Sequence, residues 1–119
     1  MVRRIYLASP YTSPDEIQCI CRYGQVCLMT AQLLREGHLV FSPIAHSHPL
    51  AGYGLPVEFE FWQRHCLSFL ETWATDLWVL TLWGWEDSRG VNAEIEFARQ
   101  RGLPVSLINL LGQTEPYHV

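Results

Sequence analysis

The chain has 119 residues, of which 49% are hydrophobic and 17% charged, and its formal net charge is −4. This size and apolar content suit one domain spanning residues 1–119, while eight basic residues that cluster no further than Arg3-Arg4 exclude the electrostatic footprint of a protein that binds a nucleic-acid polymer. No apolar run reaches the length of a membrane span and the N-terminus lacks a signal-peptide pattern, so we expect a cytoplasmic protein with no membrane partner.

The first half of the chain predicts two strands around a long helix. Arg4–Ser9 is a short apolar strand, and a turn-rich loop leads from it into a helix over Asp15–Glu36. Gly37 ends this helix, and His38–Ser42 forms the second strand. The segment Pro43–Pro56 contains three prolines, and we expect a long loop there.

Small and apolar residues recur in steps of three and four along the predicted first helix. This spacing defines one helical face, which we expect to pack on the core. The face comprises Ile17, Ile20, Cys21, Gly24, Cys27, Leu28, Ala31 and Leu34. Its two cysteines are therefore expected inside, and all four cysteines (Cys19, Cys21, Cys27 and Cys66) are expected to be reduced and mostly buried thiols.

The second half continues the alternation of strand and helix. It predicts a helix over Val57–Trp73, a buried strand over Asp76–Leu82, a helix over Val91–Arg101 and a strand over Pro104–Ile108. The tail Leu110–Val119 could add a short strand or contact a neighbouring subunit. The pattern indicates an α/β fold: a three-layer, doubly wound, mainly parallel sheet of four to five strands, Rossmann-like with flavodoxin-like strand order.

Glu94 stands at the position where such sheets bind ligands. It follows the Asp76–Leu82 strand by the first turns of a helix, and ligands of open parallel sheets bind outside the carboxyl ends of the strands. Ser88 could cap that helix or donate to an anion, and Gly90 allows close approach of the backbone. The alternative is a solvated Glu94 paired with an arginine of its own helix.

Three segments together resemble the nucleoside 2-deoxyribosyltransferase superfamily, which includes the nucleoside 5′-monophosphate N-glycosidases. They are Tyr6–Tyr11, Phe41–His46 and Ser88–Glu94, the last followed by Ala98. The Ser-x-Gly-Val-x-x-Glu-x-x-x-Ala pattern resembles the signature that carries the family's nucleophilic glutamate. The resemblance therefore implies that Glu94 is a catalytic nucleophile.

The resemblance also implies roles for other residues. Tyr6 matches a tyrosine near the sugar that could orient the glutamate, although a core tyrosine is the alternative. Asp76 matches a family aspartate that could cap or orient, and we group it with the catalytic candidates. Substrate-binding positions are implied or proposed at Ser9, Tyr11, His46, Asp87, Ser88 and Gly90. Among these, Ser88 falls where the monophosphate glycosidases place a phosphate-binding serine.

One position departs from the family pattern. Relatives carry an aspartate on the helix before the third strand, where it assists protonation of the leaving base, and here Cys66 or Ser68 takes that place. Protonation could then fall to Asp87, to His65 or to a histidine of the long loop, or the reaction could need no strong acid.

These features predict an N-glycoside hydrolase that acts on a nucleoside or nucleoside 5′-monophosphate. A nucleoside 2-deoxyribosyltransferase with the same nucleophile is the close alternative, and a non-catalytic nucleotide-binding module is the alternative from another class. A zinc site built from His46, His48, His65 and Cys66 is more remote, because their spacing matches no known ligand pattern.

The expected partner is a small nucleoside or nucleotide, with no cofactor and no metal. Five Trp, five Tyr and five Phe exceed what so small a core needs, so some should line a pocket or a subunit contact. Together with the assembly of relatives, this predicts a homodimer or homotetramer.

Overall fold

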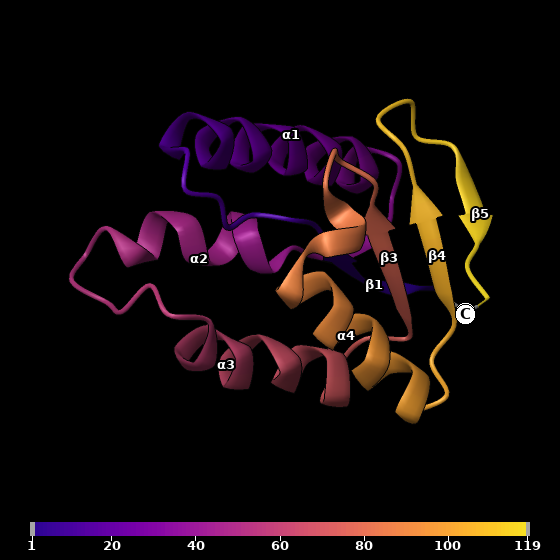
Figure 1. The fold of residues 1–119 in the computed structure, drawn as a ribbon. Helices are drawn as coiled ribbons and strands as arrows, with labels where there is room; N and C mark the ends of the chain where they lie inside the picture. Colours follow the sequence, from indigo (N-terminus) through magenta and orange to yellow (C-terminus); the bar gives the residue numbers. More distant parts are fainter. Residues whose placement is uncertain (1, 119) are drawn as a thin grey trace.

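The computed structural model describes residues 2–118 and shows a five-stranded sheet flanked by helices (Figure 1). The strands are β1 (Arg4–Ala8), β2 (Leu39–Phe41), β3 (Asp76–Leu80), β4 (Val105–Ile108) and β5 (Thr114–Pro116). The helices are α1 (Glu16–Arg35), α2 (Pro43–Ala51), α3 (Phe59–Thr72) and α4 (Arg89–Gln100), with a short 3₁₀ turn, η1 (Trp85–Asp87), before α4. Within the described range, no helix combines the length and apolar character needed to cross a bilayer.

The strand order is β2-β1-β3-β4-β5. β1 pairs in parallel with β2 and β3, and β3 pairs in parallel with β4. This confirms the α/β, mainly parallel arrangement and the flavodoxin-like order of its first four strands. The tail forms β5, which pairs antiparallel with β4, so the strand alternative for this segment is the one adopted.

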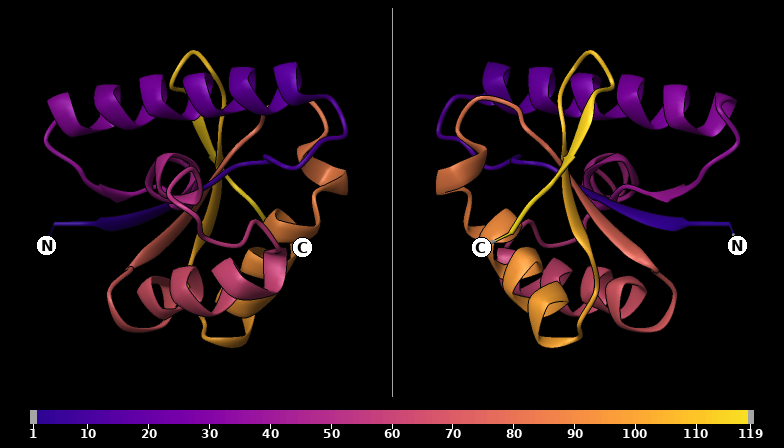
Figure 2. Two further views of the ribbon diagram at one scale, coloured as in Figure 1. Left: turned by 90° about the vertical axis from the view of Figure 1, so that its left-hand side faces the viewer. Right: turned by 90° about the vertical axis from the view of Figure 1, so that its right-hand side faces the viewer.

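Side chains alternate between two cores, one on each face of the sheet. Ile5 and Leu7 of β1 pack with residues of α1, whereas Tyr6 and Ala8 face the layer formed by α3 and α4. The strand β3 divides in the same way. Figure 2 shows α1 along one side of the sheet and α3 and α4 along the other. The alternation brings Tyr6 to the side on which α4 carries Glu94.

The buried face of α1 differs from the predicted one. The residues of α1 that face the sheet are Arg22, Val26, Met29 and Leu33, whereas Ile17, Ile20, Leu28 and Leu34 of the predicted face are exposed. Both faces show steps of three and four, so periodicity alone could not choose between them. Arg22 made its face look polar in the sequence. Its guanidinium is satisfied by the carbonyls of Thr12 and Trp83, at 3.0 and 2.9 Å.

All four cysteines are free in the structure, but the predicted burial is correct only for Cys66. That thiol is buried, whereas Cys21 is exposed and Cys19 and Cys27 are half-buried. The prediction followed from assigning the core to the wrong side of α1.

The predicted loop after β2 begins instead with α2. The Ser42 hydroxyl caps this helix by accepting a hydrogen bond from the Ala45 amide at 3.1 Å. Pro43 occupies the first turn, where its missing N–H costs nothing, and only Pro49 near the end lies inside the helix. Proline content suggested a loop, but the positions of the prolines are compatible with a helix of nine residues.

Candidate active site

A pocket of about 700 Å³ opens at the carboxyl ends of β1 and β3. Its walls come from the end of β1 and the loop after it, from α2 and α3, and from the junction of η1 with α4. In the order β2-β1-β3, the strand after β1 is added on one side of it and the next strand on the other side, and this switch point between β1 and β3 is where sheets of this type bind ligands. The fold therefore creates the pocket at the edge that the sequence predicted.

Glu94 and Tyr6 meet in this pocket. Glu94 lies in the second turn of α4, whose buried residues Val91, Ile95 and Ala98 hold the helix against the sheet. The Tyr6 hydroxyl donates a hydrogen bond to Oε2 of Glu94. Tyr6 is fully buried, so its ring cannot move away without disturbing the core. The tyrosine therefore fixes the direction in which the carboxylate points.

The surroundings of this pair favour its neutral forms. Burial raises the pKa of Glu94 to about 7, and the hydrogen bond from Tyr6, which lowers that pKa, offsets burial only in part. Burial also raises the pKa of Tyr6 well above its usual value, and the nearby charge of Glu94 adds to this effect. Tyr6 is therefore a hydrogen-bond donor at physiological pH, while Glu94 can lose or gain its proton close to neutrality.

The N-terminus of α4 forms one rim of the pocket. Ser88 caps the helix by accepting a hydrogen bond from the Val91 amide at 3.2 Å, which leaves the hydroxyl hydrogen free to be donated. Gly90 also lines the pocket, and a Cβ there would stand 3.9 Å from the Phe59 ring. Free amides at the start of a helix attract anions. This rim therefore has the groups that an anionic ligand requires.

Ser9 adds a polar group to the pocket wall. It lies directly after β1, and only 5% of its surface is exposed. Its Oγ has no hydrogen-bond partner among residues 2–118. Since buried hydroxyl groups are almost always hydrogen-bonded, Ser9 is an exception that leaves an unsatisfied polar group in the pocket wall.

Tyr11 and His48 form a second pair in the pocket lining. The Tyr11 hydroxyl lies 2.6 Å from Nδ1 of His48, and both residues line the pocket. The His48 imidazole also stacks on Tyr23 of α1, with 3.9 Å between ring centres. The pair thus presents a positioned imidazole to the pocket.

His46 was predicted at the ligand site, but the structure places it outside the pocket lining. Two residues along a helix point to different sides, so the helical form of α2 sends His48 to the pocket and His46 toward α3. There His46 packs on Phe41, and its Nε2 lies 3.0 Å from Nε2 of His65. The error followed from treating this segment as a loop.

The helix α3 closes the pocket with a thiol and aromatic rings. Burial raises the pKa of Cys66 to about 12, and the charge of nearby Glu94 contributes, so this side chain stays a neutral thiol. Cys66 rather than exposed Ser68 therefore occupies the side of α3 that faces the glutamate. Phe59 and Trp62 supply flat apolar surface, and the Arg89 guanidinium lies 4.5 Å from the centre of the Phe59 ring.

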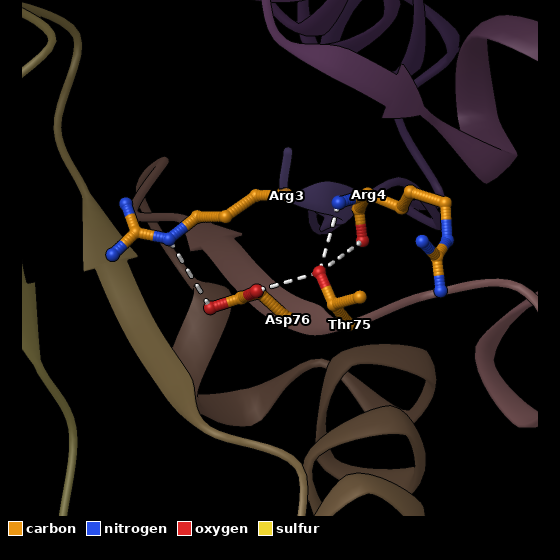
Figure 3. A network of polar contacts seen from close by, with 4 residues as sticks. All are labelled: Arg3, Arg4, Thr75 and Asp76. Atoms are coloured by element: carbon orange, nitrogen blue, oxygen red, sulfur yellow. Dashed lines mark hydrogen bonds and ion pairs between the residues drawn. The ribbon is translucent and has the colours of Figure 1, made fainter. Parts of the chain in front are cut away.

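Asp76 was predicted as a catalytic candidate, and the structure corrects this. It begins β3, at the amino edge of the sheet, whereas the pocket opens at the carboxyl edge. Figure 3 shows its carboxylate between Thr75, whose hydroxyl donates to it at 2.8 Å, and Arg3, whose Nε lies 3.7 Å away. A strand of five residues separates the two edges, so Asp76 lies away from the pocket.

The zinc alternative is not assembled. His46 and His65 approach one another, but His48 is held by Tyr11, and Cys66 faces Glu94. Between residues 2 and 118, no group of three or more His, Cys, Asp or Glu side chains is arranged to hold a metal ion.

Of the remaining predicted binding residues, Ser9, Tyr11, Asp87, Ser88 and Gly90 all line the pocket. No sequence pattern indicated a pocket role for Phe59, Trp62 or Arg89, and His48 was only one of several candidate histidines. A helical reading of Pro43–Ala51 would have found His48, because it places that residue on the same side as Ser47 and Ile44. The α3 residues carried no comparable signal.

The sequence matches a family described as a domain of unknown function, DUF1937, over residues 3–110. This match covers most of the chain, so the protein belongs to that family. No curated protein matches the sequence.

Proposed function

We propose that this member of the DUF1937 family is an N-glycosidase that cleaves the bond between base and sugar in a nucleoside or nucleoside 5′-monophosphate. The observation that carries the proposal is the half-buried Glu94 carboxyl, which is hydrogen-bonded by Tyr6 and lines a pocket whose rim is the N-terminus of α4. The resemblance of the Ser88–Glu94 segment to the nucleophile signature of the 2-deoxyribosyltransferase superfamily supports the same assignment.

Glu94 would act on the anomeric carbon of the sugar. Cleavage of an N-glycosidic bond develops positive charge on the sugar as the bond to the base breaks, and a carboxylate beneath it can stabilise that charge or bond to the anomeric carbon as a covalent glycosyl intermediate. Water then attacks the same carbon, which releases the sugar and regenerates the carboxylate. The raised pKa of Glu94 means that its anion is poorly stabilised in the free protein. The positive charge that develops on the sugar in the transition state would stabilise the Glu94 anion. Because this stabilisation is greater in the transition state than in the free protein, it would accelerate the reaction.

The rim would hold the phosphate of a monophosphate substrate. Ser88 and Glu94 are separated by six residues, or about 9 Å along a helix axis, which is on the scale of a sugar with its 5′-phosphate. Ser88 can donate to the phosphate while it caps α4, and Gly90 allows the phosphate to approach the backbone. Ser9, whose hydroxyl is unpaired within the described residues, would bind another polar substrate atom.

His48 is the proposed donor of a proton to the leaving base. It lines the pocket, whereas His65 is exposed and paired with His46 outside the lining. If the Tyr11 hydroxyl donates to Nδ1 of His48, the other ring nitrogen carries the proton that can be transferred. Asp87 lines the same pocket and is the second candidate. Phe59 and Trp62 offer flat surfaces for the base.

The test is incubation of the protein with a panel of nucleosides and nucleoside monophosphates, with and without a second free base, followed by chromatography. Release of free base by the wild type and not by Glu94→Gln supports the hydrolase. Appearance of a new nucleoside with the added base would establish the transferase instead. Ligand binding without turnover by either protein would favour a nucleotide-binding module.

The phosphate assignment has its own matched pair of variants. Ser88→Ala removes both a helix cap and the proposed phosphate donor, whereas Ser42→Ala removes a helix cap outside the pocket lining. Both changes should cost about 0.5–2 kcal/mol of stability. Only Ser88→Ala should weaken binding of a monophosphate relative to its nucleoside. Equal weakening by both variants would reduce Ser88 to a cap.

A further inference from the structure

The outer side of α1 is apolar over its whole length. Four large side chains there have much of their surface exposed: Ile17 70%, Ile20 59%, Leu28 73% and Leu34 51%. The charged residues of α1 are Glu16 and Arg35 at its two ends and Arg22, which is buried toward the sheet. A helix that is apolar both toward the core and away from it is one that is normally covered on both sides.

The outer residues follow the spacing of a helix that packs on another helix. The positions form the series Ile17, Ile20, Gly24, Cys27, Ala31 and Leu34, with alternating steps of three and four. This alternation is the heptad spacing with which two helices pack side by side at a small crossing angle. We define these six residues as the outer seam of α1.

Gly24 at the middle of the seam has no explanation within one protomer. A Cβ added there would meet nothing within 4 Å, so the protein's own packing does not require glycine. Glycine inside a helix costs about 0.5–1 kcal/mol relative to alanine. Its presence is explained if another backbone approaches α1 closely at this point, next to the small residue Cys27.

We propose that the outer seam of α1 is the interface of a two-fold symmetric homodimer, in which α1 packs antiparallel against α1 of a second copy. A two-fold axis through the middle of α1 sets Ile17 opposite Leu34 of the second copy and Ile20 opposite Ala31. It also sets Gly24 opposite Cys27, so the smallest residues meet at the centre. The seam is complementary to itself, as a two-fold interface requires.

The charged residues at the two ends of α1 are also compatible with an antiparallel dimer. The axis that aligns the seam brings Glu16 of one copy next to Arg35 of the other, on both sides of the interface. Both residues are exposed, and neither takes part in an ion pair within the described part of one protomer. A parallel arrangement would instead place like charges together, which disfavours it. Charge complementarity therefore selects a second copy in the antiparallel direction.

The size of the face sets how far the interface extends. A helix of 20 residues is about 30 Å long and 10 Å wide, so α1 alone covers about 300 Å², below the roughly 800 Å² per partner of a stable interface. The loop between β4 and β5 widens the face. Its Leu111 is 80% exposed, and its Gly112 lies next to the Gln32 side chain of α1. Figure 2 shows this loop rising beside the helix.

The experiment measures the oligomeric state of four proteins by sedimentation velocity, at concentrations from the low to the high micromolar range. Circular dichroism checks that each protein is folded. Wild type should sediment as a dimer. Ile20→Glu should raise the dissociation constant at least about tenfold, because it buries an unpaired charge. Gly24→Phe should do the same through a clash with Cys27 of the second copy, while the melting temperature of the monomer does not fall. Phe61→Glu, on exposed surface of α3, is the matched control and should leave the dimer intact.

Charge exchange tests the direction of the helices. Glu16→Arg and Arg35→Glu should each weaken the dimer, and the double variant should restore it because the pair is re-formed across the axis. A wild type that stays monomeric at every concentration would overturn the proposal, and so would a dimer that neither Ile20→Glu nor Gly24→Phe weakens. A dimer that loses affinity with Ile20→Glu but is not restored by the double charge variant would overturn the antiparallel arrangement.

Discussion

The two edges of the sheet carry similar residues and use them differently. At the amino edge, Asp76 is paired with Thr75 and Arg3, and the Arg4 amide donates to the Thr75 hydroxyl at 2.8 Å (Figure 3). At the carboxyl edge, Glu94 has Tyr6 as its one donor among residues 2–118, and its pKa is raised to about 7. The charge of the Asp76 carboxylate is compensated by Thr75 and Arg3. The charge of the Glu94 carboxylate is not compensated by its neighbours.

This contrast gives a criterion for distinguishing a structural from a functional carboxyl group in such a sheet. Both carboxylates are close to a strand end, and both matched family positions in the sequence. What distinguishes them is whether neighbours compensate the charge, because carboxyl groups with strongly raised pKa values are concentrated at functional sites.

The largest effect should come from Glu94→Gln. Gln keeps the shape and can still hydrogen-bond with Tyr6, but it cannot stabilise a cationic sugar or form the glycosyl intermediate. We expect kcat to fall at least about a thousandfold with the fold unchanged. Release of free base by chromatography measures it, and circular dichroism confirms folding. Retention of more than a tenth of the activity would remove Glu94 from the mechanism.

The same variant should be more stable than wild type at alkaline pH. The pKa of Glu94 is raised on folding, so the folded protein holds this proton more tightly than the unfolded chain, and stability falls as pH rises from about 4.5 to about 7. The loss is at most about 3 kcal/mol above pH 7. Gln, which cannot ionise, avoids it.

Urea unfolding at pH 5 and pH 8 measures this difference. Wild type and Glu94→Gln should have similar free energies of unfolding at pH 5, and the variant should be the more stable at pH 8. Equal stability at both pH values would show that the charge at the carboxyl edge is compensated after all, and the contrast with Asp76 would disappear.

The sequence predicted the carboxyl edge better than the residues around it. Strand and helix alternation places the ends of parallel strands together, so Tyr6, Ser9, Ser88, Gly90 and Glu94 could all be assigned to one edge and do line one pocket. Periodicity could not decide which of two equivalent faces of α1 is buried. That choice depends on how Arg22 is satisfied by distant carbonyls, which only the folded chain reveals.

Local conformation accounts for the other errors. The pocket histidine is His48 and not His46, because Ser42 and Pro43 start a helix where three prolines suggested a loop. Asp76 was taken for a site residue because it leads a strand whose other end reaches the pocket. The sequence pattern located this strand correctly, but Asp76 lies at its amino end, and the pocket lies at its carboxyl end.

Tyr6→Phe should have an intermediate effect on the carboxyl edge. The Tyr6 hydroxyl orients the Glu94 carboxylate and lowers the pKa of Glu94, and Tyr6→Phe removes this hydroxyl. We therefore expect kcat to fall by about ten- to a hundredfold, as for the loss of one hydrogen bond to a charged group. The acidic limb of the pH–rate profile should also move to higher pH. Tyr117→Phe, outside the pocket lining, is the matched control and should change neither quantity. A fall in kcat without movement of the limb would mean that Tyr6 acts on the substrate and not through Glu94.

The smallest effect should come from Asp76→Asn at the amino edge. Asn preserves the shape and can still accept from the Thr75 hydroxyl, and the ion pair that it loses involves a largely exposed Arg3 at 3.7 Å. Exposed ion pairs contribute about 0–1 kcal/mol, so the free energy of unfolding should fall by no more than about 1 kcal/mol. Activity should stay within about twofold of wild type, because a compensated carboxylate at the far edge has no unmet charge to offer a substrate. A large loss of turnover in a folded Asp76→Asn protein would therefore show that the edges are coupled, and that satisfaction by neighbours does not separate structural from functional acids in this sheet.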